Sequence, residues 1–186
     1  GFSMLKSKMN DSQIIESYLV DLLSAVSLLH ENKLHAQSLT IILSAIDSFG
    51  LLDAPDSENK ASGKLFKAWV NKYFCQNPGI EYTAEDLWAY RCSVLHTYTT
   101  HSELSKAKKA REILFYAGDK FSVQASEFTE FAHSIDNNAH VAASIDETIL
   151  TFTLCSQQFA RDLGAKCLVS KQVQTRVSRL LHKARW

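Results

Sequence analysis

Two residues of this chain, Arg91 and His96, have the types and the spacing that proton transfer beside an anion requires. Histidine exchanges protons near neutral pH, and the planar arginine guanidinium stays charged and binds two oxygens of one phosphate. Tyr98 follows two positions after His96. Apolar residues recur around them at helical spacing, namely Leu87, Trp88, Val94 and Leu95. Arg91 therefore lies within an apolar stripe, where it needs either a buried acid as its partner or a cleft that binds an anion.

The pattern formed by Arg91, His96 and Tyr98, R-x4-H-x-Y, resembles the signature of the HEPN superfamily. Two upstream segments, residues 44–52 and 63–70, also resemble the helices that precede the motif helix in that superfamily. The resemblance covers roughly residues 12–165. It implies a mostly helical domain, and many HEPN members are metal-independent RNA endonucleases of toxin–antitoxin and defence systems.

The chemistry that this resemblance implies divides between the two residues. His96 moves a proton while the RNA 2′-hydroxyl attacks the adjacent phosphorus, and Arg91 stabilises the extra negative charge on the phosphorane. Single-stranded RNA is the expected substrate, with a 2′,3′-cyclic phosphate and a 5′-hydroxyl as the product ends. DNA lacks the nucleophile and should resist. No metal or cofactor is expected.

The spacing of Arg91 and His96 sets a geometric condition. Positions five apart lie about 140° around an α-helix, so the helix must end or bend near His96 for both side chains to converge. The resemblance implies a further solution, in which two motif helices meet across a two-fold axis, and we therefore expect a homodimer with RNA as its ligand. It also implies an antitoxin or a nucleotidyltransferase partner, the latter modifying Tyr98.

Each of these residues also has a structural alternative. Arg91 can pair with Asp47, which would then support the site by orienting the guanidinium. His96 can be a hydrogen-bonded residue at a helix end, and Tyr98 can be part of the core. Cys92 stands where active members commonly carry a polar residue, and the net charge of the chain is zero. Both features favour the alternative function, a catalytically inactive module that binds a nucleotide, RNA or protein.

A basic cluster follows the motif and is the candidate nucleic-acid-binding surface: Lys106, Lys108, Lys109 and Arg111. Such a cluster can attract RNA phosphates, and it can equally be a solvated helix face. Residues 161–186 are also rich in lysine and arginine. The net charge of zero argues against a protein that coats nucleic acid indiscriminately.

Length and composition indicate one helical domain over residues 1–186, with residues 1–10 set aside from the fold. The chain has two prolines, six glycines and no uninterrupted apolar run of about 18 residues, so we expect no membrane span. The start lacks the apolar region of a signal peptide. The four cysteines show no zinc-site spacing, so we expect reduced thiols in a cytoplasmic protein.

The apolar periodicity predicts a mostly all-α, up-and-down helical bundle. The expected helices cover residues 11–31, 35–50, 62–75, 83–98, 103–111, 145–163 and 169–184. Asp11 or Ser12, Ser62 and Thr83 are expected to cap helices, and Gly50 and Gly164 are expected to end them. Residues 113–117 and 140–144 are expected to pair as a small hairpin-like excursion. Residues 125–131 fit either a short strand or one helical turn.

Overall fold

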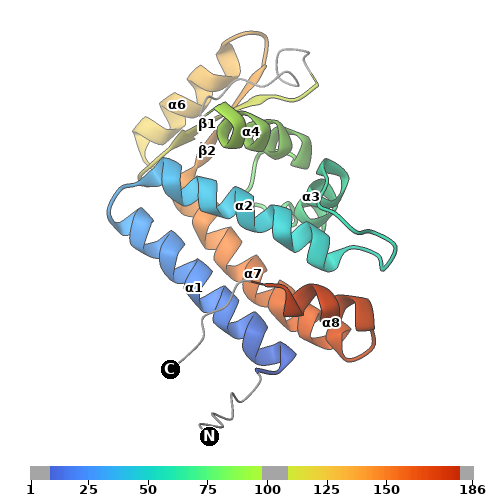
Figure 1. The fold of residues 1–186 in the computed structure, drawn as a ribbon. Helices are drawn as coiled ribbons and strands as arrows, with labels where there is room; N and C mark the ends of the chain where they lie inside the picture. Colours follow the sequence, from blue (N-terminus) through green and yellow to red (C-terminus); the bar gives the residue numbers. More distant parts are fainter. Residues whose placement is uncertain (1–8, 98–108, 181–186) are drawn as a thin grey trace, which may run out of the picture.

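The computed structural model describes residues 9–97 and 109–180. Its helices and strands are α1 (Asp11–Glu31), α2 (His35–Asp53), α3 (Gly63–Trp69), the π-helix η1 (Val70–Phe74), α4 (Ala84–Thr97), β1 (Glu112–Tyr116), α6 (Val123–Ser134), β2 (His140–Ser144), α7 (Ile145–Cys167) and α8 (Lys171–Ser178). The expected mostly all-α class is confirmed. Helices form the body of the molecule, and the two short strands lie with α6 at one end of it (Figure 1).

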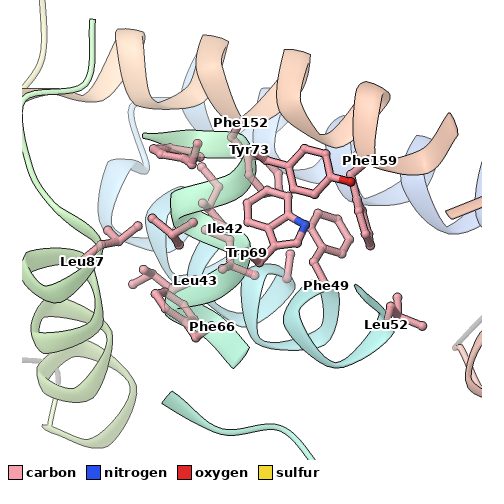
Figure 2. Packing of buried hydrophobic residues seen from close by; sticks show 14 of the residues in the cluster. Ile42, Leu43, Phe49, Leu52, Phe66, Trp69, Tyr73, Leu87, Phe152 and Phe159 are labelled. Atoms are coloured by element: carbon pink, nitrogen blue, oxygen red, sulfur yellow. The ribbon is translucent and has the colours of Figure 1, made fainter. Parts of the chain in front are cut away.

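An aromatic cluster holds the helices together at the centre of the core. Phe49 of α2 contacts Trp69 of α3 and Phe159 of α7, with ring centroids 5.3 and 4.8 Å apart. Figure 2 shows these rings between α2 and α7, with the indole of Trp69 among them. Large aromatic side chains bury the most apolar surface per residue, so this cluster fixes how α2, α3 and α7 pack.

Two glycines that were expected to end helices lie inside them. α2 continues past Gly50 to Asp53, and α7 continues past Gly164 to Cys167. Gly50 is buried where α3 crosses α2, and a Cβ there would lie 2.8 Å from the backbone carbonyl carbon of Leu65. The prediction of a stop was therefore wrong, because this glycine permits a close approach of two helices rather than a turn.

The helix starts are fixed by side-chain caps. α1 covers the expected residues, but its cap is Asn10 rather than Asp11 or Ser12, and Asn10 and Gln13 form a reciprocal capping box. Asn10 thus belongs to the fold, although residues 1–10 were set aside. Ser62 caps α3, as expected. The backbone N–H of Asp86 donates to Thr83 Oγ1 at 3.2 Å, which confirms the expected cap of the motif helix.

The two strands pair as expected, but in parallel, so the hairpin prediction was wrong. Glu112 lies opposite His140, and Tyr116 lies opposite Ser144. Parallel strands need a crossover connection, and α6 provides it. The undecided segment at residues 125–131 lies within this helix.

Two of the predicted helices extend into residues that the structure does not describe. The helix expected at 103–111 lies mostly in residues 98–108, and residues 109–111 are not helical. The helix expected at 169–184 is shorter than predicted, because α8 runs from Lys171 to Ser178 and ends at Arg179 within the described residues. Its Arg176 is buried and donates to the carbonyl oxygens of Ala54, Pro55 and Glu58. This arginine fastens α8 to the loop that follows α2.

Among the described residues, one helix is long and apolar enough to cross a membrane by length and composition. That helix is α1, with a mean hydropathy of 1.3 over its most apolar window. The sequence analysis expected none because charged residues interrupt every apolar run. Since a core helix of a soluble protein meets the same criterion, this property does not assign a location.

Candidate functional site

The arginine of the motif is held by an acid from another helix, as the sequence analysis anticipated. Arg91 of α4 donates from Nε at 2.8 Å and from a terminal nitrogen at 2.6 Å to the same carboxylate oxygen of Asp47 on α2. The two side chains are 19% and 18% exposed. The pair is therefore partly buried and reaches the surface, which fixes the direction of the guanidinium.

An aromatic side chain supports Arg91 from a second direction. The guanidinium carbon lies 5.0 Å from the ring centroid of Trp88, one turn earlier on α4. Trp88 in turn lies against Phe66 and Gly63 of α3, where a Cβ on Gly63 would approach the indole to 2.7 Å. The glycine thus makes room for the indole, and the indole and Asp47 together define where Arg91 sits.

The histidine of the motif lies on the same helix. α4 is described as far as Thr97, one residue after His96, and residues 98–108 lie outside the described part of the chain, so the expected end or bend of the helix near His96 stays a prediction. The side chain of His96 and the whole of Tyr98 lie outside the described residues, so the structure does not place them relative to Arg91.

The thiol beside Arg91 is kept protonated. Cys92 is half-buried, and desolvation raises its pKa, while the neighbouring Arg91 opposes this to a smaller extent. Thiolates, not thiols, are the nucleophiles of cysteine chemistry. Cys92 is therefore an apolar neighbour of the arginine rather than a reactive group.

The four residues of the expected nucleic-acid-binding cluster do not share one situation in the structure. Lys106 and Lys108 lie outside the described residues, and Lys109 is exposed. Arg111 donates from Nε and a terminal nitrogen to the buried carboxylate of Asp86, at 3.1 and 2.8 Å. It thereby fastens the start of β1 to the first turn of α4.

The structure also shows a polar pocket that the sequence analysis did not identify. It lies at the carboxyl ends of β1 and β2, has a volume of about 250 Å³, and is lined in part by Tyr82, Tyr116, Lys120 and Ser144. Lys120 donates to Glu147 at 2.8 Å within this region, so these two charges satisfy each other. No sequence motif marks the pocket, since its residues come together only through the crossover.

Acidic and histidine residues near this pocket form pairs rather than a metal site. Asp146 bonds to His30 Nε2 at 2.8 Å and accepts a hydrogen bond from the backbone N–H of Gly118. Among the described residues, no three His, Cys, Asp or Glu side chains are grouped so as to hold a metal ion.

Comparisons of the chain with protein-family models, with curated proteins and with solved structures found no match.

Proposed function

We propose that this protein is a metal-independent RNA endonuclease whose site is built on α4 around Arg91 and His96. Arg91 binds the scissile phosphate and stabilises the added charge as the 2′-hydroxyl attacks. His96 transfers the proton, because imidazole is the side chain that exchanges protons near neutral pH. The 2′-hydroxyl and the phosphate supply all the reacting atoms, so the mechanism needs no metal ion.

The observation that carries this proposal is the fixed position of Arg91. Asp47 holds the guanidinium from one side and Trp88 from another, while about a fifth of the side chain remains exposed. The ion pair and the cation–π contact together limit the directions that the guanidinium can take. A preorganised donor loses little entropy when a phosphate binds, which is what electrostatic catalysis requires.

A second observation favours the alternative function, a catalytically inactive binding module. Arg111 is committed to Asp86, so one of the four basic residues assigned to RNA is engaged within the fold. Fewer available cations mean weaker attraction of RNA phosphates and a lower dependence of binding on salt. In this alternative, Arg91 binds a phosphate group without cleaving RNA.

The deciding experiment is the cleavage of single-stranded RNA by the purified full chain in the presence of EDTA. Substitution of His96 by alanine is expected to reduce the rate by at least about 100-fold, the lower end of the range for general acid–base catalysis. Arg91→Lys keeps the charge but loses the two-pronged donation to Asp47, and a similar reduction is expected. Both variants must give the circular dichroism spectrum of the unmodified protein.

The substrate provides the matched control. RNA with a 2′-O-methyl group at the cleaved position and DNA of the same sequence should both resist, because neither carries the attacking hydroxyl. Cleavage of RNA that persists undiminished in His96→Ala would refute the assignment of His96. Binding of RNA without cleavage, lost in Arg91→Lys, would instead establish the alternative function.

A further inference from the structure

The polar pocket at the carboxyl ends of β1 and β2 already holds one cation, which belongs to the chain itself. Lys120 Nζ donates to Glu147 Oε2 at 2.8 Å and lies 5.1 Å from the ring centroid of Phe121. Lys120 and Phe121 both line the pocket. A carboxylate and the face of an aromatic ring both attract an ammonium ion. With its own lysine, the chain therefore shows which kind of ion this pocket accommodates.

The ion pair of Lys120 and Glu147 lies where two hollows adjoin. Lys120 and Ser144 line both the pocket of about 250 Å³ and a second, more open hollow of about 440 Å³. Glu147 can occupy its position because residue 79 is a glycine. A Cβ on Gly79 would lie 2.0 Å from Glu147 Oε1. The glutamate thus lies against the backbone of the loop that forms one wall of the pocket.

A second carboxylate and a second aromatic ring line the same pocket. Glu81 is exposed and forms no ion pair with any other described residue. Tyr116 is half-buried. Burial raises the pKa of Tyr116, and the negative charge of Glu81 raises it further, so this carboxylate lies near the phenol. Glu81 and Tyr116 therefore repeat the combination of carboxylate and ring that holds the Lys120 ammonium, but without a cation of their own.

The other positive groups near the pocket are engaged by other acids. A terminal nitrogen of Arg111 donates to the backbone carbonyl oxygen of Glu81 at 3.1 Å, but the guanidinium is paired with Asp86. His30 bonds to Asp146 at 2.8 Å. Neither group is left to neutralise the carboxylate of Glu81.

The part of the chain around the pocket is strongly acidic. Residues 112–147, which run from β1 to the first turn of α7, carry seven Asp or Glu residues and a single Lys or Arg, which is Lys120. Asp119, in the loop after β1, is exposed and forms no ion pair with a described residue. This charge repels phosphate groups and attracts cations, so it opposes RNA or a nucleotide as the ligand.

We propose that this pocket binds a small organic amine, with the ammonium group at Glu81 and the carbon chain against the ring of Tyr116. The carboxylate supplies charge-assisted hydrogen bonds, and the ring supplies a cation–π contact and apolar surface. A volume of about 250 Å³ suits a small ligand such as a diamine. A metal ion is not the ligand, since no three suitable side chains are grouped within the described residues. This binding does not depend on RNA cleavage.

The main test is calorimetric titration of the full chain with 1,4-diaminobutane at about 0.15 M salt, which screens distant charges. We expect saturable binding of the diamine and none of 1,4-butanediol, which has a similar size but no charge. Glu81→Gln should weaken binding by about tenfold or more. Glu16→Gln is the matched control, because it removes the same charge from an exposed position on α1, and it should bind as the unmodified protein does.

The aromatic wall has its own pair of variants. Tyr116→Leu should weaken binding of the diamine by about threefold or more, because it removes the ring from the pocket. Tyr116→Phe keeps the ring and should bind as the unmodified protein does. Equal weakening in both variants would show that the hydroxyl, not the ring, holds the ligand, and would overturn the proposed contact.

Lys120 gives a test in the opposite direction. Lys120→Met removes the internal ammonium and leaves Glu147 to a ligand, so the diamine should bind about tenfold more tightly. Lys171→Met removes the same charge from an exposed position on α8 and should leave the affinity unchanged. The diamine should also raise the Tm of Lys120→Met more than that of the unmodified protein.

Three results would overturn the proposal. The first is the absence of saturable binding at about 1 mM diamine. The second is binding that is as strong in Glu81→Gln as in Glu16→Gln, which would place the amine elsewhere. The third is a Lys120→Met protein that binds the diamine no more tightly than Lys171→Met does.

Discussion

The sharpest prediction about stability concerns Gly50. The close crossing of α2 and α3 leaves room at this position only for the hydrogen atom of a glycine. An alanine there would place its Cβ 2.8 Å from both the carbonyl carbon and the oxygen of Leu65, and 3.0 Å from the backbone nitrogen of Phe66. Favourable contacts between carbon atoms lie at about 3.5–4.0 Å, so the two helix backbones must move apart. Because the contacting atoms belong to the backbone, a change of side-chain rotamer cannot relieve the overlap.

The size of the effect follows from two opposing terms. Alanine in place of glycine inside a helix contributes about 0.5–1 kcal/mol of stability, and overpacking of a buried site typically costs about 1–3 kcal/mol or more. Because the contact at Gly50 is backbone against backbone, the overpacking dominates. We expect Gly50→Ala to lower the free energy of unfolding by about 1–3 kcal/mol, which corresponds to a fall in Tm of roughly 2–12 °C.

Gly164 provides the control within the same protein. It also lies inside a helix, but nothing lies within 4 Å of a Cβ built there. Gly164→Ala should therefore show only the stabilisation that alanine gives over glycine inside a helix, and should raise Tm by roughly 1–4 °C. Thermal unfolding followed by circular dichroism measures both variants. A Gly50→Ala protein as stable as the unmodified one would refute the close crossing of α2 and α3.

Two further predictions concern groups that titrate. Tyr73 donates a hydrogen bond to Asp162 at 2.7 Å, and this bond is the main cause that lowers the pKa of Asp162 below 3.8. A lowered carboxyl pKa stabilises the fold above the unfolded pKa, and because Asp162 is partly exposed and screened by solvent, Tyr73→Phe should cost about 0.5–1 kcal/mol at neutral pH. Urea unfolding should show this difference shrinking as the pH falls below 3.8, and a difference independent of pH would contradict it. Burial raises the pKa of Cys75 to about 11 and also raises that of Cys92, Cys155 and Cys167. All four thiols should therefore react slowly with iodoacetamide at pH 8 in the folded protein and rapidly in urea, and rapid labelling of one thiol in the folded state would contradict its burial.

The sequence predicted most helices well because their apolar periodicity is strong. The start and end of α1 were predicted at the residues where the structure has them, and the cap at Thr83 was predicted correctly, since both depend on nearby residues. α6 was left undecided because it rests on a two-stranded sheet and buries few side chains, chiefly Ala125 and Ala132. A helix with so small a buried face leaves little periodicity to detect.

Features that depend on contacts between distant segments were not predictable in the same way. Glycine ends many helices, but it also lies where two helices approach closely, and only the position of α3 distinguishes these roles at Gly50. The direction of strand pairing likewise depends on whether the connection is a turn or a helix. The sequence predicted the partnership of Arg91 with Asp47 because both lie on apolar helical stripes.

Two arginines show where prediction of the candidate site reached its limit. Arg91 and Arg111 were both assigned to phosphate binding, and each proves to be held by a carboxylate from another element. Asp47 holds Arg91 at the surface beside Trp88, whereas Asp86 is buried and draws Arg111 toward the cap of α4. Arg111 is nevertheless the more exposed of the two arginine side chains, at 34% against 19% for Arg91, so pairing with an acid does not by itself distinguish an arginine that binds a ligand from one that holds the fold together.

The number of chains that the candidate site needs is a separate question. If Arg91 and His96 of one chain suffice for cleavage, the rate of RNA cleavage per chain should stay constant as the protein is diluted. A site composed of two chains requires α4 at a two-fold axis, and the covered side chains of residues 84–95 oppose that arrangement. Activity per chain that disappears on dilution would instead show that the site depends on the association of two chains.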